Sequence, residues 1–276
     1  SILVSSPLHL NISHLNMLDI KISPDSIGFY VDSLKADLSI FPNTSITDLN
    51  GSFGFTRDQI DLSEMHLKLG ETEINSEISL RLTHGNWTEF KRDSVFINMN
   101  LLPSIIDSKD FKLKKYLKDH RRISLELQME GYMNELQLSS LSGTLETGSL
   151  LNAQGSINGM VGIDSTILTL EIIDSYWVQE DLRVYLKEYH HGPFRFAGSI
   201  QGNKDEMLIL GKAINQYGNI DLDLNLMNLL SPEKISYHGK VDFDDFQLGK
   251  IIDDSRLGKS GGRLIFKGFG MDPKTM

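Results

Sequence analysis

Two stretches of the sequence carry side chains that could hold a metal ion. His190 and His191 are adjacent, and neighbouring residues of a strand point to opposite faces, so at most one of them would aim at a given ion. An aspartate group near the end of the sequence has the composition of a calcium-binding loop; it consists of Asp242, Asp244, Asp245, Asp253 and Asp254. It lacks the glycine at the sixth position and the glutamate at the twelfth that such a loop needs. The spacing therefore favours solvated carboxylates, and no metal or other cofactor is expected.

A third cluster is basic and could contact phosphate groups. It is formed by Lys112, Lys114, Lys115, Lys118, Arg121 and Arg122. Runs of charge are usually the solvated face of a helix, and this interpretation is favoured here. Three tripeptides that begin at Asn11, Asn43 and Asn86 match a glycosylation sequon, which is short enough to occur by chance. The sequence contains no phosphate loop, dinucleotide fingerprint or Ser/His/Asp arrangement, so an enzyme is not expected.

Composition indicates a globular chain and excludes several classes of protein. The 276 residues, 40% of them hydrophobic and 23% charged, suffice for one large or two ordinary domains. A net charge of −10 opposes binding to nucleic acid, which is not expected as a partner. The absence of cysteine excludes disulfides, Cys-ligated zinc and thiol catalysis. No stretch approaches the roughly 18 consecutive apolar residues of a spanning helix.

The elements that must position these side chains are strands, because apolar and polar residues alternate with period two through most of the chain. Ile60 and Leu62 begin one such run, the phase slips by one residue at Ser63-Glu64, and Met65 resumes it, which predicts a β-bulge. Further alternating runs lie at 34–40, 123–129, 167–173 and 220–226. Clusters of Asn, Asp and Gly between the runs suit hairpins. A mainly β, antiparallel fold is therefore predicted.

The alternation also repeats at a longer period. Leu136 and Leu138 follow Gly131 at the same distances at which Met207 and Ile209 follow Gly202, about 70 residues later. The only segments with a helical pattern, 107–121, 175–189 and 243–254, recur at a similar interval. We predict one continuous array over residues 1–276, with approximate repeat units 1–122, 123–193 and 194–259 and the start of a further unit at 260–276. Each unit combines several strands with one short crossing helix.

Three stretches carry a resemblance to a known family. Residues 245–276 read as a short helix, the turn Gly-Lys-Ser-Gly-Gly, a strand, a Gly-x-Gly and then Asp-Pro-Lys-Thr. Together with 8–41 and 60–82 they resemble the TamB proteins of Bacteroidetes-type bacteria, which belong to the AsmA-like family. The resemblance covers most of the chain. It implies an elongated β-taco, or repeating β-groove, with short crossing helices and an apolar concave face.

The resemblance also implies a function and a location. Such a groove would be a segment of a periplasmic bridge that passes phospholipid between the inner and outer membranes. The alternative is a factor for outer-membrane protein assembly or secretion that acts through strand pairing with an Omp85-type, TamA-like partner. The full-length protein would be anchored in the inner membrane by an N-terminal segment outside this sequence, which is expected to be an internal fragment. A carbohydrate-active β-helix or sandwich would need paired carboxylates in a cleft, and it has little support.

A groove of this kind gathers one alternation phase on a continuous apolar face, while alternate positions such as Lys68, Glu126 and Asp221 stay polar. Acyl chains could lie on that face, each buried methylene contributing roughly 0.8 kcal/mol. The residues expected to line it are Ile60, Leu62, Met65, Leu67, Leu69, Ile78, Leu80, Leu82, Leu125, Leu127, Met129, Leu136, Leu138, Leu168, Leu170, Leu222, Leu224 and Leu226. The alternative reading of the same alternation is the closed core of a β-sandwich.

Overall fold

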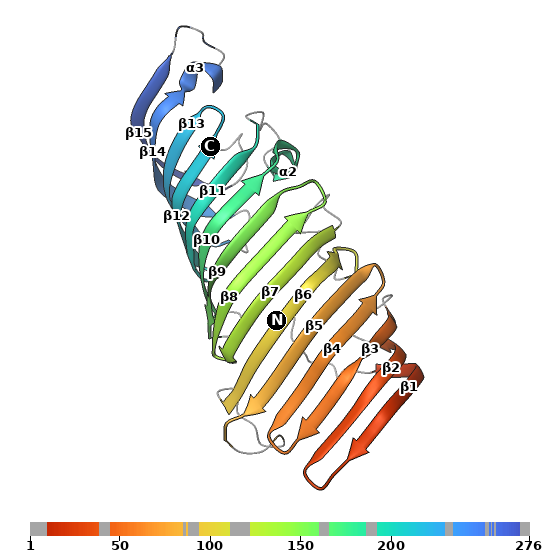
Figure 1. Ribbon diagram of the computed structural model, residues 1–276. Helices are drawn as coiled ribbons and strands as arrows, with labels where there is room; N and C mark the ends of the chain where they lie inside the picture. Colours follow the sequence, from red (N-terminus) through yellow and green to blue (C-terminus); the bar gives the residue numbers. More distant parts are fainter. Residues whose placement is uncertain are drawn as a thin grey trace. The chain divides into compact units, whose positions relative to one another are not determined.

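The computed structural model describes residues 10–38, 45–84, 87, 94–110, 122–159, 166–185, 192–229, 234–251, 254, 256 and 258–270. The chain divides into two compact units, Ser1–Met133 and Asn134–Met276, which are considered one at a time. Figure 1 shows that nearly all of the described chain is β-strand. Every strand is antiparallel to the strands it pairs with, which confirms the predicted mainly β fold.

The described part of unit 1 forms seven strands that pair in chain order. They are β1 (Leu10–Ile22), β2 (Ser26–Leu38), β3 (Ser45–Thr56), β4 (Gln59–Leu69), β5 (Thr72–Leu82), β6 (Val95–Asp107) and β7 (Arg122–Tyr132). Tight turns join β1 to β2, β3 to β4 and β4 to β5, and the β4–β5 turn places Gly70 at a φ of 63°. A side chain is strained at that angle, so glycine suits the position.

The described residues of unit 2 form eight strands, again paired in chain order, and two short helices. The strands are β8 (Glu135–Leu145), β9 (Leu150–Asn158), β10 (Ile167–Trp177), β11 (Phe194–Gly202), β12 (Glu206–Asn215), β13 (Gly218–Met227), β14 (Ser236–Gln247) and β15 (Lys259–Phe269). The helices are α2 (Gln179–Tyr185), after β10, and α3 (Leu248–Ile251), after β14. Within the described ranges, no helix is long and apolar enough to cross a bilayer.

The short helices lie in two of the three segments expected to contain them, and both are shorter than those segments. In 175–189 the helix begins only at Gln179, because Ser175 and Trp177 remain in β10, paired with Phe196 and Phe194. In 243–254 the strand continues to Gln247 before α3 begins. Cross-strand pairing therefore overrides the helical pattern at both starts. In the third segment, Asp107 ends β6, residues 108–110 form a turn, and 111–121 lie outside the described residues.

Bulges interrupt the pairing near the middle of many strands. Between β4 and β5 the register shifts from the pair Leu62–Ile78 to the pair Met65–Ser76, so β4 carries one extra residue. Glu64, within this bulge, has a φ of 54°, and the bulge predicted at Ser63-Glu64 is confirmed. The extra residue keeps the apolar side chains before and after it on the same face. Comparable shifts occur in β6, β10 and β14, and bulges bend the strands that carry them.

Each unit has one apolar and one polar face. In unit 1 the pairing aligns Leu62, Ile78, Met99 and Met129 across β4 to β7. On the opposite face Lys68 Nζ lies 2.8 Å from Glu73 Oε1 in the neighbouring strand. Among the described elements, extensive contacts between strands join only neighbours in chain order, so each unit is a single layer of strands. The apolar face is accordingly only half-buried along strands such as β7.

A connection of more than ten residues follows β5, and others follow β6, β10 and β14, at intervals of four strands. The strands that come next, β7, β11 and β15, begin at Arg122, Phe194 and Lys259, close to the starts expected for the repeat units. The division into compact units falls elsewhere, after Met133 and between β7 and β8. The array of repeat units remains a prediction.

Candidate functional site

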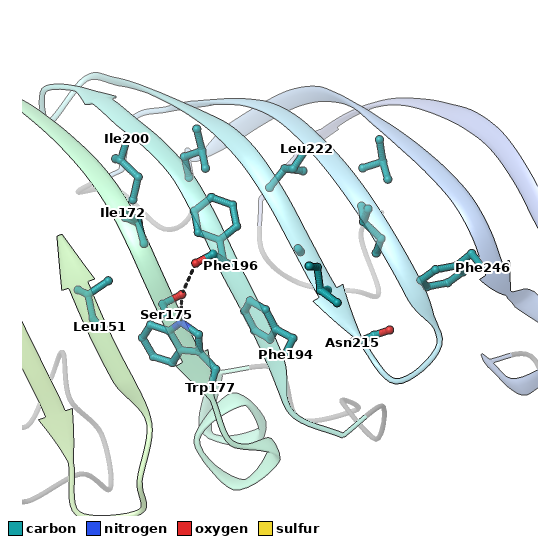
Figure 2. Close-up of a pocket in the computed structure, with 15 residues that line it drawn as sticks. Leu151, Ile172, Ser175, Trp177, Phe194, Phe196, Ile200, Asn215, Leu222 and Phe246 are labelled. Carbon is teal, nitrogen blue, oxygen red and sulfur yellow. Dashed lines mark hydrogen bonds between the residues drawn. The ribbon is translucent and has the colours of Figure 1, made fainter.

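A cavity of about 560 Å³ hollows the apolar face of unit 2. Strands β9 to β14 all contribute to its lining, which includes Leu151, Ile172, Phe196, Ile200, Leu222 and Phe246. Figure 2 shows these side chains on the inner side of the curved strands. No lining residue is charged, and Ile200, Ile209 and Leu222 remain partly exposed. The cavity is therefore an open apolar hollow.

Small residues let an aromatic ring form part of the cavity lining. One row of paired residues runs from Ile172 in β10 through Gly198 and Gly211 to Leu222 in β13. A Cβ atom on Gly211 would lie 2.6 Å from Cζ of the Phe196 ring, so the absence of a side chain lets that ring lie over β12. The Phe196 ring therefore covers part of the glycine row, and Ala213 of β12 also lines the cavity.

Aromatic rings cover other glycines on the same face. Phe266 lies against Gly239, its register partner, and a Cβ atom there would be 3.0 Å from Cζ of the ring. Phe243 lies in the same way against Gly262, where the corresponding distance is 2.9 Å. Each ring lies over the backbone of a glycine, in space that a side chain at that position would otherwise fill. Aromatic residues therefore complete the apolar surface at the glycines of β14 and β15.

The few polar side chains that line the cavity form hydrogen bonds with other groups of the protein. Ser175 is fully buried; its Oγ donates to the carbonyl oxygen of Phe196 at 3.0 Å and accepts a hydrogen bond from Trp177 Nε1 at 3.2 Å. Asn215 Oδ1 accepts a hydrogen bond from the backbone N–H of Tyr217 at 2.8 Å. Figure 2 shows the two bonds of Ser175. Because these groups are used within the protein, the surface facing the cavity is almost entirely hydrocarbon.

A pair of stacked rings forms one wall of the cavity. The centroids of Trp177 and Phe194 are 6.5 Å apart, with an angle of 15° between the ring planes. The opposite face of the same two strands is polar. There Arg195 lies over the ring of Tyr176 and pairs with Asp174 at 3.1 Å. The alternation of the two strands thus separates an aromatic wall from a solvated face.

All the expected lining residues of unit 2 share the face of the cavity. Leu222 lines the cavity itself. Register pairing with β11 and β12 places Leu168, Leu170, Leu224 and Leu226 on the same face. Leu136 and Leu138 of β8 also lie on it but are only 1% and 5% exposed, so they are packed core.

The expected lining residues of unit 1 also gather on one face. The half-buried ones are Ile60, Leu62, Met65, Leu67, Ile78, Leu80, Leu125, Leu127 and Met129. Leu69 and Leu82 lie at strand ends, where they are 2% and 5% exposed. That these residues share an apolar face is observed; that the face holds lipid remains a prediction.

Sequence reasoning missed the aromatic residues that shape the cavity, Trp177, Phe194 and Phe196. Trp177 falls in a segment that was expected to be helical. Phe194 and Phe196 alternate around Arg195, which is a short strand signal that could have been found. Their position opposite Trp177 and Ser175 depends on the register, which no local pattern gives.

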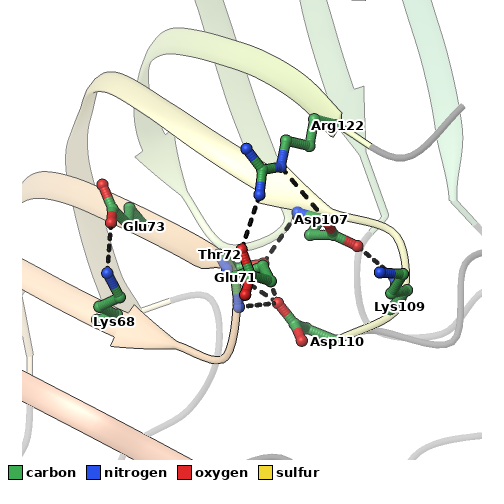
Figure 3. A network of polar contacts seen from close by, with 8 residues as sticks. All are labelled: Lys68, Glu71, Thr72, Glu73, Asp107, Lys109, Asp110 and Arg122. Carbon is green, nitrogen blue, oxygen red and sulfur yellow. Dashed lines mark hydrogen bonds and ion pairs between the residues drawn. The ribbon is translucent and has the colours of Figure 1, made fainter. Parts of the chain in front are cut away.

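A polar network in unit 1 fixes the turn between β4 and β5 (Figure 3). Oδ2 of Asp110 accepts hydrogen bonds from the backbone N–H of Glu71 at 3.0 Å, and from the N–H and hydroxyl of Thr72 at 2.9 and 2.8 Å. Thr72 Oγ1 in turn accepts the N–H of Asp107 at 2.9 Å. Arg122 binds Glu71 at 2.7 Å. The network joins the ends of four strands, and its groups are used in structural contacts.

Unit 2 has a related arrangement built on Asp181 of α2. This carboxylate is 1% exposed and accepts hydrogen bonds from the hydroxyls of Thr147 and Ser149, in the turn between β8 and β9. Ser149 Oγ also accepts the N–H of Val178 at 3.0 Å. The two arrangements correspond. In unit 1 the aspartate follows β6 and binds the turn between β4 and β5, and in unit 2 it follows β10 and binds the turn between β8 and β9.

Most of the described charged groups that the sequence singled out form ion pairs, whereas Asp244 Oδ1 accepts a hydrogen bond from the backbone N–H of Asp245 at 2.9 Å. Asp242 lies 2.5 Å from Arg263 and 3.1 Å from Lys240, and the hydrogen bond from Arg263 is the main reason why the pKa of Asp242 is lowered. Asp245 and Asp254 pair with Lys259 and Arg256. Asp253, His190, His191 and the basic cluster except Arg122 lie outside the described residues, among which no group of acidic or histidine side chains has metal-binding geometry.

Comparison with family models, with curated proteins and with solved structures gives no match for this chain. The apolar face, its cavity and the resemblance of the sequence to the AsmA-like family are therefore the features that bear on function.

Proposed function

We propose that the apolar face of this chain holds the acyl chains of phospholipids and lets them pass along a groove. The observation that carries the proposal is the open cavity of about 560 Å³ with no charged lining residue. Its volume lies within the range of roughly 300–1,000 Å³ found for small-molecule sites. Each methylene that leaves water for such a surface contributes roughly 0.8 kcal/mol, so a chain of many methylenes would bind well.

The half-exposure of the lining favours a ligand over a sealed core. In a β-sandwich a second sheet covers the apolar face at about 10 Å. Here each unit is a single layer of described strands, and Ile200, Ile209 and Leu222 keep part of their surface open. An apolar surface left open in this way ordinarily marks a binding site.

Hydrogen bonding favours a hydrocarbon occupant over a peptide. A peptide laid in the cavity would bring backbone N–H and C=O groups into an apolar site, and each unpaired group costs roughly 1–3 kcal/mol. The polar side chains there, Ser175 and Asn215, already bond to protein groups. An acyl chain has no such groups, so it can fill the cavity without this penalty.

The resemblance to the AsmA-like family gives the proposal its setting. We place the chain in a periplasmic bridge, anchored in the inner membrane through a segment outside this sequence, that carries phospholipid to the outer membrane. The proposed activity is transfer without a chemical step. Lipid binding is the part of this proposal that the cavity supports.

The alternative proposal is assembly of outer-membrane proteins with an Omp85-type partner. The observation that favours it lies in β15, where the apolar side chains of Ile265 and Phe269 are 75% and 62% exposed. A strand with exposed apolar side chains can take part in pairing with a strand of another chain. Ile265→Lys would weaken such pairing and leave lipid binding unchanged, which separates the two proposals.

Mass spectrometry of the purified chain tests the main proposal. We expect native mass spectra to contain protein with bound phospholipid, and extraction to release the same lipid. After delipidation, the chain should take up a fluorescent phospholipid from vesicles. Protein that neither retains phospholipid nor takes it up would overturn the proposal.

A further inference from the structure

We infer that the cavity in unit 2 is a discrete station for one acyl chain, with Trp177 as a wall that the chain touches and Ala213 as a residue that sets the room available to it. The inference rests on the proposed function and deepens it. It predicts where along the apolar face a chain rests, whereas the proposed function requires only that chains bind somewhere on that face.

The lining of the cavity gives the station its boundaries. Ile172 and Leu222 stand at the two ends of the row that contains Gly198 and Gly211, and the ring of Phe196 covers Gly211 between them. Ala213 has the smallest side chain of the lining, so it leaves room for an acyl chain over β12.

The aromatic wall is held in place before any ligand arrives. Trp177 is fixed by its hydrogen bond to Ser175 and by its stacking on Phe194. Its ring nitrogen is occupied by that bond, so the ring offers carbon atoms to the cavity. A preformed wall reduces the ordering cost of binding. These features favour a resting place for a chain over a surface that chains merely pass.

Unit 1 provides a contrast on its own apolar face. Its row Leu62, Ile78, Met99 and Met129 carries a large side chain on each of β4 to β7. No pair of glycines interrupts that row, so the row has no counterpart of the Phe196 ring over Gly211. This part of the cavity lining is therefore a local feature of unit 2, as a discrete station requires.

Fluorescence quenching can locate the chain, since the sequence contains only two tryptophans. In a Trp87→Phe background, Trp177 is the only tryptophan. Phospholipids brominated on the acyl chain quench an indole that they touch. We expect them to cause a large loss of Trp177 fluorescence, compared with the same phospholipids without bromine. The matched control adds Trp177→Phe and Tyr176→Trp, which moves the indole to the opposite face of β10 and should abolish the quenching.

Substitution of Ala213 provides the second arm. Ala213→Leu reduces the room in the cavity and should abolish the quenching of Trp177, whereas Ala197→Leu, on the exposed face of β11, should leave it unchanged. Bound phospholipid is measured by mass spectrometry in the same samples. If lipid is bound but Trp177 is not quenched, the station is wrong and the proposed function stands. If no lipid is bound, the proposed function fails, and the station fails with it. Should Ala213→Leu not fold, the quenching of Trp177 and its Tyr176→Trp control decide the matter.

Discussion

Trp177 and Phe194 are register partners whose rings stack with 6.5 Å between their centroids. The residues next to them in sequence, Tyr176 and Arg195, are also partners, and they interact on the opposite face. One pair of strands thus carries an aromatic wall on one side and a cation over a ring on the other. A change on one face should therefore leave the other face intact.

Leu224→Arg should remove lipid binding and leave the protein folded. Leu224 is half-buried on the apolar face, so an arginine there can extend its charge toward solvent while it blocks the groove. Phospholipid retained on purification should fall, with little change in the circular dichroism spectrum. Asp223→Arg, one residue away on the exposed face, is the control and should change neither quantity. Unfolding of Leu224→Arg would instead indicate an ordinary core.

Asp110→Ala should loosen the turn between β4 and β5. It removes the carboxylate that accepts the N–H groups of Glu71 and Thr72, which would cost about 1–3 kcal/mol of unfolding free energy if these donors were left unpaired. Hydrogen exchange at the two amides should become faster. Lys109→Ala, in the same turn, keeps the backbone contact to Asp107 and should exchange as the parent does. Unchanged protection in Asp110→Ala would mean that the network does not hold the turn.

Asp181→Ala should destabilise unit 2. The hydroxyls of Thr147 and Ser149 would lose a buried acceptor, and hydrogen bonds to a charged group are worth about 1.5–3 kcal/mol. The midpoint of thermal unfolding should fall. Glu180→Ala is the control on the first turn of α2, where the side chain is more exposed, and should have a smaller effect. Equal midpoints for the two variants would contradict the role given to Asp181.

The pair of Asp242 and Arg263 predicts a pH dependence. The pKa of Asp242 is lowered, first by its hydrogen bond from Arg263, so the pair contributes stability above the unfolded-state pKa and loses it as pH falls through the lower folded-state pKa. Arg263→Gln should raise the pKa of Asp242 and reduce stability at neutral pH, and this difference should vanish in acid. Titration of the carboxyl carbon by NMR measures the shift. Lys267→Gln, on the same strand, should leave the pKa of Asp242 in place; an equal shift in both variants would exclude a specific pair.

Sequence alternation predicts the two faces because a strand turns each successive side chain to the opposite side. Leu125 and Leu127 lie on the apolar face and Glu126 on the exposed one, as their spacing requires. The slip at Ser63-Glu64 is likewise readable, since a change of phase without a turn signal indicates a bulge. These features depend on local sequence alone.

The cavity depends on register, and local patterns do not give register. Gly198 and Gly211 are unremarkable in sequence; the Phe196 ring can lie over β12 only because the pairing of β11 with β12 places Gly211 beside the strand that carries the ring. The stacking of Trp177 on Phe194 arises in the same way. The contacts of Asp110 and Asp181 with their hairpin turns join residues far apart in the chain, so they too escape local reasoning.

Photo-crosslinking tests the central claim most directly. The photoreactive residue p-benzoylphenylalanine would replace Leu222, which lines the cavity, or Asp221, its neighbour on the exposed face of β13. With phospholipid bound, irradiation of the Leu222 variant should yield protein covalently joined to lipid, detected by mass spectrometry, and the Asp221 variant should yield none. Equal crosslinking at both positions, or no crosslinking at Leu222, would contradict a lipid groove on the apolar face.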